Sequence, residues 1–275
     1  MGLHRIRCVV VPLVVAVVVV TLFLLGILEE MELLILDLRL RTFAGGTPPP
    51  VTFAVIDHNT LIKLGRWPIP RGLYALVLEK IMDDGARMVL MDIDFSSIGP
   101  DPAEDRELIQ FVKNVENLVL AVQMEERKIP EGALIRNVSL PMVGLLEGAS
   151  SLGSITFEVD PDGVIRRVPE PIDFIDRMYH PMGVVGARAV DSDVPLHYPD
   201  GALINMSDEN LRSLPVVSLE KIIDDQFTPG IFRDRIVLMG AITPELHDFW
   251  LTPIGVVPGV YIQDNGRVSS TSSAR

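Results

Sequence analysis

The sequence predicts an α/β fold: a three-layer body built on a mainly parallel mixed sheet with flanking helices, preceded by one N-terminal transmembrane helix. Three observations predict it. An apolar run without a charged residue occupies positions 8–28, strand-like and helix-like segments alternate through the first half of the body, and another strand of the fully buried type follows in the second half. Such alternation is typical of a parallel sheet covered by helices.

The run 8–28 is long enough to cross a bilayer as a helix, which takes about 20 residues. It passes directly into Glu29 without a small-residue cleavage site, which favours an uncleaved signal anchor over a cleaved signal peptide. Because Arg5 and Arg7 precede the span, residues 1–7 are expected in the cytoplasm and the body outside.

Residues 29–43 are rich in Leu, Glu and Met and predict that the helix continues beyond the span. The stretch Gly45–Pro50 breaks any helix and separates this segment from the globular body. Within the first half of the body, strands and helices alternate. The strands are expected at 51–57, 87–95 and 118–123, and the helices at 71–85 and 104–114.

The second half of the body mixes short extended runs with helices. Residues 154–159 and 164–168 flank the turn Asp160-Pro161-Asp162-Gly163, which predicts a hairpin. The other elements are expected at 181–190 and 218–225 as helices, and at 235–240 and 259–263 as strands. The polar residues 266–275 are expected to be a disordered tail.

Several motifs follow one another in a defined order: Val55-Ile56-Asp57, Leu64-Gly65-Arg66-Trp67-Pro68-Ile69-Pro70-Arg71, Asp92-Ile93-Asp94-Phe95, Asp160 to Pro169, Arg235 to Ala241, Asp248, Thr252-Pro253 and Pro258-Gly259-Val260. Together they resemble the CHASE2 family of extracytoplasmic sensory domains, over residues 29–265. The resemblance implies a membrane-anchored bacterial receptor. Family members usually continue through further membrane helices into a cyclase, diguanylate cyclase or kinase. Here ten mostly small and polar residues follow Asn265, so we expect a receptor truncated before its output module.

Composition excludes several classes of function. The chain has 24 Lys and Arg against 37 Asp and Glu, a net charge of −13, so it lacks the cationic surface that nucleic-acid binding requires. Its only cysteine, Cys8, excludes an intramolecular disulfide and a cysteine zinc site. The histidines form no metal-type pair on one helix face, and no strand is followed by a phosphate-binding glycine loop, so no catalytic residue, metal or cofactor is predicted.

The candidate ligand-binding residues are Asp57, Trp67, Arg71, Asp92 and Asp94. Asp57, Asp92 and Asp94 end two strands, where parallel sheets place ligands, although carboxylates there also cap the loops and helices that follow. Trp67 lies beside prolines and could stack on a ligand or anchor the loop on the sheet edge.

A second set of motif residues is expected to support the fold. Asp160, Asp162 and Gly163 form a turn that lacks the further ligands of a calcium loop. Arg166 and Arg167 are expected to bridge to the helix acids near Asp37 rather than to clamp an anionic ligand. Two residues apart on a helix, Asp37 and Arg39 cannot pair with each other, so each needs another partner, and one of the two is expected to bond to the body. The set is completed by residues that the family resemblance alone supplies: Gly240, Asp248, Pro258 and Gly259.

The sequence therefore predicts a membrane-anchored sensory domain for an unknown small-molecule or protein ligand, which signals as a homodimer or with a partner chain. Two alternatives stay open: an exported metal-dependent hydrolase that uses the strand-end aspartates, and a structural envelope protein. Carboxyl groups with shifted pKa values in one pocket would favour the hydrolase. A pocket with apolar walls and a few polar groups would favour the sensor.

Overall fold

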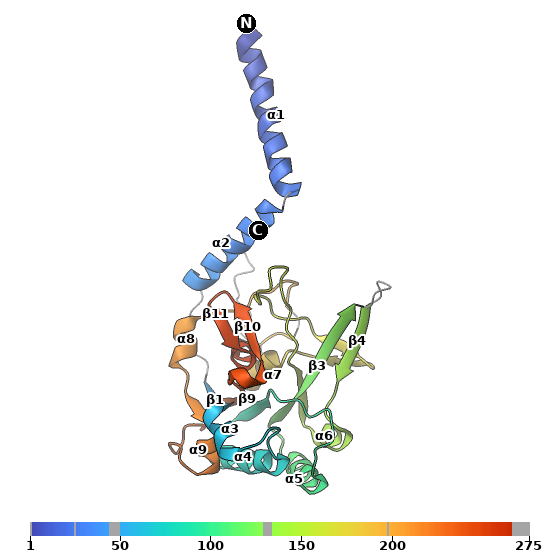
Figure 1. Ribbon diagram of the computed structural model, residues 1–275, viewed down its shortest axis with the longest axis vertical. Helices are drawn as coiled ribbons and strands as arrows, with labels where there is room; N and C mark the ends of the chain where they lie inside the picture. Colours follow the sequence, from blue (N-terminus) through green and yellow to red (C-terminus); the bar gives the residue numbers. More distant parts are fainter. Residues whose placement is uncertain (1, 25, 44–49, 129–133, 197, 266–275) are drawn as a thin grey trace. The chain divides into compact units, whose positions relative to one another are not determined.

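The computed structural model describes residues 2–24, 26–43, 50–128, 134–196 and 198–265 (Figure 1). The chain divides into two compact units, residues 1–44 and 45–275. The predicted tail 266–275, and the helix-breaking stretch except for Pro50, lie outside the described residues.

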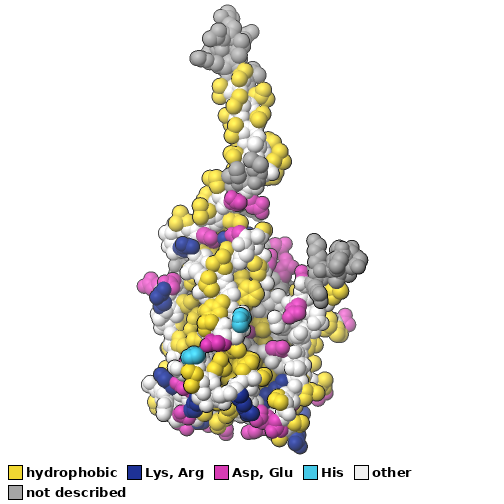
Figure 2. Space-filling model, in the orientation of Figure 1, with side chains coloured by type: hydrophobic (Ala, Val, Ile, Leu, Met, Phe, Trp, Pro, Cys, Tyr) yellow, Lys and Arg dark blue, Asp and Glu magenta, His cyan; other side chains and the backbone are white. Residues whose placement is uncertain are grey.

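The first unit contains two helices, α1 (Gly2–Leu24) and α2 (Ile27–Phe43). The predicted continuation of one helix through this segment is wrong, because the backbone of Gly26 is left-handed, with φ +72°, a conformation that interrupts an α-helix and suits glycine. From Val10 to Leu24, most side chains of α1 are hydrophobic and exposed (Figure 2). Among the described residues no single helix is both long and apolar enough for a membrane span, whereas 10–24 and 28–42, bent by 74°, meet the requirement as a pair.

The body is built on a mainly parallel sheet, as predicted. Within the described residues it has seven strands, in the order β4-β3-β2-β9-β1-β8, with β5 beside β3, and the pairing of β3 with β4 is antiparallel while the others are parallel. The strands are β1 (Val51–Ile56), β2 (Met88–Met91), β3 (Leu118–Lys128), β4 (Leu134–Ser139), β5 (Ser151–Ser154), β8 (Val216–Ser218) and β9 (Ile236–Ala241). Although β9 comes late in the sequence, it lies between β1 and β2.

Alternate residues of each strand enter two hydrophobic cores, because side chains of a strand point to opposite faces. In β1, Ala54 and Ile56 belong to one core and Val51, Phe53 and Val55 to the other. The sheet is therefore buried on both faces. This is the three-layer arrangement that the near-continuous apolar strands predict.

One face of the sheet is covered by helices that share the larger core (Figure 1). These helices are α3 (His58–Leu64), α4 (Arg71–Asp83), α5 (Pro102–Val112), α6 (Val143–Gly148) and α9 (Leu219–Ile223). On the other face, Met182 of α7 (Met182–Val190) and Val260 of α10 (Gly259–Ile262) pack against the second core, and α8 (Asp208–Ser213) adds Leu211. Two hairpins and two short 3-10 helices complete the body: β6 (Ile172–Phe174) with β7 (Arg177–Tyr179), β10 (Phe249–Thr252) with β11 (Gly255–Pro258), η1 (Pro244–Leu246) and η2 (Gln263–Asn265).

The predicted hairpin around residues 160–163 is wrong in part. The turn is present, with Gly163 at φ +84°, but its flanks form isolated bridges rather than two paired strands. Backbone bonds lead away from the turn, because the Ile165 N–H donates to the Leu251 carbonyl and the Val168 N–H to the Ala202 carbonyl. Between the flanks themselves there is one antiparallel bridge, Glu158 with Arg167, so other segments supply the rest of their support.

The predicted last strand, 259–263, is also wrong, because α10 occupies residues 259–262. Valine, tyrosine and isoleucine there favour a strand by intrinsic preference. Pro258 precedes the helix, and the side chain of Val260 fits so closely over Gly240 of β9 that a Cβ on that glycine would lie 2.8 Å from it. Tertiary packing overrides the local preference.

Candidate functional site

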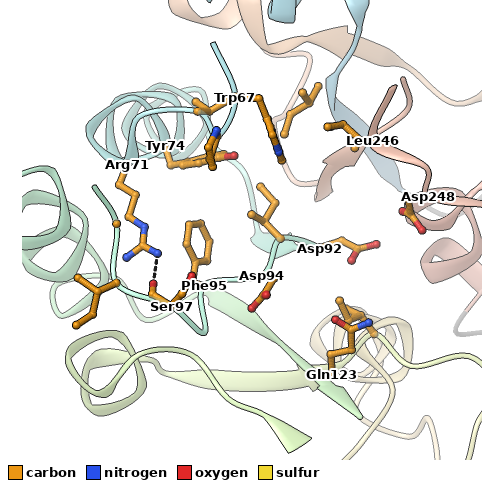
Figure 3. A pocket seen from close by; sticks show the side chains of 18 of the residues that line it. Trp67, Arg71, Tyr74, Asp92, Asp94, Phe95, Ser97, Gln123, Leu246 and Asp248 are labelled. Atoms are coloured by element: carbon orange, nitrogen blue, oxygen red, sulfur yellow. Dashed lines mark hydrogen bonds between the residues drawn. The ribbon is translucent and has the colours of Figure 1, made fainter. Parts of the chain in front are cut away.

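A cavity of about 530 Å³ lies at the carboxyl ends of β2 and β9 (Figure 3). Its walls come from the segment before and into α4, the loop after β2, the middle of β3, residues 155–157 and the turn between β9 and β10. This is the edge at which open parallel sheets place ligands. Segments that are far apart in the sequence meet there because β9 lies directly beside β2.

Aromatic side chains form much of the wall. Tyr74 and Phe95 meet edge to face with ring centroids 5.4 Å apart, and Phe157 and Trp250 do so at 5.5 Å. Trp67, which is 49% exposed, lines the cavity from the loop before α4. Rigid rings around a few polar groups are typical of a site for a small organic molecule.

Arg71 lies in the wall, but other protein groups already occupy its guanidinium. Nη1 donates to Oδ1 of buried Asp105 at 2.6 Å, and Nη2 donates to the carbonyl oxygen of Ser97 (Figure 3). The guanidinium also lies 5.5 Å from the centroid of the Phe95 ring. Its charge is balanced within the protein, so Arg71 fixes the loop after β2 rather than offering a free positive charge.

Asp92 and Asp248 approach each other from the end of β2 and from the turn before β10 (Figure 3). The carboxyl of Asp92 is partly exposed toward the cavity yet otherwise surrounded by protein, and this burial, together with the charge of Asp248, raises its pKa to about 8. Within the described residues, neither a hydrogen bond nor a cation reaches that carboxyl. Near neutral pH the carboxyl of Asp92 is therefore mostly protonated.

Asp248 is held more firmly than Asp92. Its Oδ1 accepts a hydrogen bond from Nε1 of Trp250 at 2.8 Å. Burial raises the pKa of Asp248, while the bonds from Trp250 and from the backbone N–H of Gly259 partly offset that rise. A Cβ on Gly259 would lie 2.5 Å from a carboxylate oxygen of Asp248, so only glycine fits beside this acid.

The structure places the five predicted ligand residues differently. Trp67, Arg71, Asp92 and Asp94 all line the cavity. Asp94 bonds within its own turn, where the backbone N–H of Ser96 donates to Oδ1 at 2.7 Å. Asp57 does not line the cavity.

Asp57 instead caps α3, which is the structural role that the sequence left open. Its Oδ1 accepts bonds from the backbone N–H of Thr60 at 2.9 Å, from the Thr60 hydroxyl at 2.7 Å and from the Ser218 hydroxyl at 2.8 Å. Burial acts to raise the pKa of Asp57, but these bonds outweigh it, and the pKa lies below 3.8.

The arginines after the 160–163 turn form salt bridges with the acids of that turn, and the expected bridges to the helix acids near Asp37 stay a prediction. Buried Arg166 donates to Asp160 at 3.0 Å and to Asp162 at 2.7 Å, and Arg167 donates to Asp160 at 2.9 Å. These residues form a charge-balanced cluster. In α2, Asp37 is half-buried and Arg39 exposed, and the bond of one of them to the body stays a prediction.

Sequence reasoning missed several residues of the cavity, among them Tyr74, Gln123, Phe157 and Trp250, and treated Asp248 as part of the fold only. One signal was available, because Gln123 ends the strand predicted at 118–123 and should lie at the same sheet edge as Asp92. The aromatic residues carry no such signal. They reach the cavity through loops whose paths the sequence does not define.

The family model for the CHASE2 domain matches residues 14–266 of this chain. The chain belongs to the CHASE2 family. The match extends further toward the N-terminus than the motifs that suggested it, which begin to resemble the family near residue 29. No curated protein and no solved structure matches the chain.

CHASE2 domains are extracytoplasmic sensory parts of membrane receptors and form a sensory rather than an enzyme family. In this CHASE2 domain Asp92 and Asp248 both line the cavity, Gly240 lies beside Asp92, and Gly259 lies beside Asp248. Residues assigned to the fold and residues assigned to a ligand therefore belong to one structural unit.

Proposed function

We propose that this chain is the ligand-binding sensory domain of a bacterial receptor and that it binds a small molecule in the cavity beside Asp92. The observation that carries the proposal is the cavity itself: about 530 Å³, walled by aromatic side chains, at the carboxyl edge of the sheet of a sensory-family domain. Its size falls within the range of about 300–1,000 Å³ that is usual for small-ligand sites.

The protein offers a direct optical test. Its two tryptophans, Trp67 and Trp250, both line the cavity, so the intrinsic fluorescence of the whole chain reports on occupancy. A small molecule that binds there should shift the emission of the full chain in an uncharged detergent. Ala241→Phe, which fills the cavity from the end of β9, should abolish that response, and an unchanged response in this variant would contradict the proposal.

We further propose that residues 8–28 anchor the chain in the inner membrane with the N-terminus in the cytoplasm. The apolar sequence of this segment and the positions of Arg5 and Arg7 support it. A reporter that is active only in the periplasm should be active after Arg275, and Arg5→Glu with Arg7→Glu should weaken the orientation. Activity of a cytoplasmic reporter at the same position would overturn this topology.

A second candidate function is hydrolysis, and one observation favours it. Asp92 and Asp248 meet in one cavity with raised pKa values, and a protonated and an ionised carboxyl side by side can act as general acid and base. Among the described residues no three His, Cys, Asp or Glu side chains converge to hold a metal ion, so the metal-dependent form lacks a ligand set there. Turnover of chromogenic glycosides, esters or phosphates by the full chain, lost in Asp92→Asn, would favour the hydrolase over the sensor.

A further inference from the structure

We propose that the cavity takes a small organic cation, an ammonium group on an apolar body, with the ammonium held between Asp92 and Asp248 and the body against the aromatic wall. This inference rests on the proposed ligand-binding function and names the chemical class of the ligand. It follows from the charges, the rings and the unpaired carboxyl that the cavity brings together.

The charges that face Asp92 come from several elements. Asp248 belongs to the turn before β10, Arg71 and Tyr74 belong to α4, and Asp94 lies on the same loop as Asp92. Arg71 is neutralised by Asp105 at 2.6 Å. Burial raises the pKa of Tyr74, so this phenol stays neutral. The cavity therefore presents uncompensated negative charge and no free positive charge among its described lining residues.

The two acids differ in how well they are satisfied. Asp248 accepts a bond from Trp250 at 2.8 Å, whereas within the described residues the carboxyl of Asp92 accepts none. A carboxyl that is enclosed by protein without a donor is destabilised as an anion, and a bound ammonium would supply both the missing donor and the missing charge. The Asp92 carboxyl, to which no described residue donates a hydrogen bond, therefore lies where the ammonium of the ligand would donate one.

The wall suits the rest of such a ligand. Trp67 and Trp250 line the same cavity as the acid pair, and indole faces attract cations within about 6 Å of the ring. An anionic ligand would meet two acids and no free arginine. A neutral hydroxyl ligand could accept a hydrogen bond from protonated Asp92, but it would gain nothing from the negative charge.

Cation binding should be coupled to proton release. The ammonium favours the ionised acid pair, so its affinity should rise as the pH increases from 6 to 9, a range in which a primary ammonium of pKa about 10.4 stays protonated. A neutral ligand that accepts a hydrogen bond from protonated Asp92 would show the opposite trend. The sign of the pH dependence therefore separates the two ligand classes.

The test compares three probes with one ring body and different charge: cyclohexylmethylammonium, cyclohexylmethanol and cyclohexanecarboxylate. Binding to the full chain in an uncharged maltoside detergent is measured by calorimetry, and by the fluorescence of Trp67 and Trp250. The ammonium should bind at least tenfold more tightly than the alcohol at pH 8. Its Kd should decrease by at least threefold between pH 6 and pH 8.

Variants identify the residues responsible. Asp92→Asn and Asp248→Asn should each raise the Kd of the ammonium at least tenfold and flatten its pH dependence. Asp57→Asn is the matched control, because it removes one negative charge at the end of β1, on the other side of β9 from β2, keeps a residue that can cap α3, and does not line the cavity. It should change the Kd by less than threefold.

The remaining outcomes are separable. If the alcohol or the carboxylate binds in the cavity at least as tightly as the ammonium, the proposal of a cationic ligand is overturned, while the cavity remains a ligand site. If none of the probes binds at millimolar concentration, two proposals are overturned: that the ligand is a cation, and that the cavity binds small ligands of this kind. Ammonium binding that survives in both acid variants would overturn the placement between Asp92 and Asp248.

Discussion

Two clusters of aspartates in this CHASE2 domain have the same chemistry and opposite electrostatics. Around the 160–163 turn, Asp160 and Asp162 are matched by Arg166, whose side chain is 1% exposed, and by Arg167. At the cavity, Asp92 and Asp248 face each other, and the nearby Arg71 is committed to Asp105. The first cluster is complete without a ligand.

The difference teaches how to separate structural acids from functional ones. Hydrogen bonds from Arg166 lower the pKa of Asp162, whereas burial raises the pKa of Asp92. A lowered carboxyl pKa means that the fold stabilises the charge, and a raised one means that the charge is tolerated at a cost. Such a cost is a reason to look for a ligand, provided that a cavity adjoins the group.

The largest expected effect concerns the balanced cluster. Arg166→Met should lower the free energy of unfolding by about 3–5 kcal/mol, because it leaves buried Asp160 with fewer partners. Urea unfolding of the full chain in detergent measures it. Arg212→Met is the control, since the Arg212–Asp208 pair is exposed and its loss should not change the midpoint. Equal effects of the two substitutions would contradict the assignment.

The second prediction concerns the unbalanced pair. Because folding raises the pKa of Asp92 above 3.8, the folded chain keeps a proton that the unfolded chain releases, and stability falls as the pH rises from 3.8 toward about 8. Asp92→Asn removes this loss, so its stability relative to wild type should grow by at most about 3 kcal/mol between pH 5 and pH 7. Unfolding curves at both pH values measure the difference. A constant difference would show that Asp92 titrates normally.

A third prediction tests whether the shape of the cavity depends on glycine. Gly259→Ala should destabilise the protein by about 1–3 kcal/mol, because its Cβ would lie 2.5 Å from the Asp248 carboxylate. It should also change the fluorescence of Trp250, which bonds to Asp248. Gly72→Ala is the matched control, because its Cβ meets only the movable end of exposed Glu107. Unaltered fluorescence in Gly259→Ala would show that Asp248 can move without cost.

Much of the fold was predictable because it depends on local patterns. The strands near 51, 88 and 118 are short apolar runs between helices, and their mainly parallel pairing follows from that order. The insertion of β9 between β1 and β2 was not predictable, since it depends on contacts between residues far apart in the sequence. Neither was α10, whose strand-forming residues are held in a helix by packing on Gly240.

The site residues show the same difference between what local sequence predicts and what depends on distant contacts. Asp57 and Asp92 both end buried strands, and the sequence offers the same two interpretations for each. Thr60 lies three residues after Asp57 and is a local signal for a cap, but Ser218 is 161 residues away and gives no such signal. The pairing of Asp92 with Asp248 is equally remote. The chemical type of the site residues could be predicted, whereas their partners required the structure.

The smallest expected effect concerns Asp57, a strand-end acid that the fold satisfies. Asp57→Ala should cost about 1 kcal/mol at neutral pH, because α3 loses its N-cap. Since hydrogen bonds hold the pKa of Asp57 below 3.8, this contribution is present above pH 3.8 and is lost as the pH falls through the lower, folded-state pKa. The stability difference between wild type and Asp57→Ala should therefore shrink on acidification, while the difference for Asp92→Asn grows on going to higher pH. Unfolding curves from pH 3 to pH 7 measure the first trend.

Affinity for cyclohexylmethylammonium at pH 8 should be unchanged in Asp57→Ala, and a tenfold loss would show that strand-end acids act on the cavity through general electrostatics rather than through direct contact.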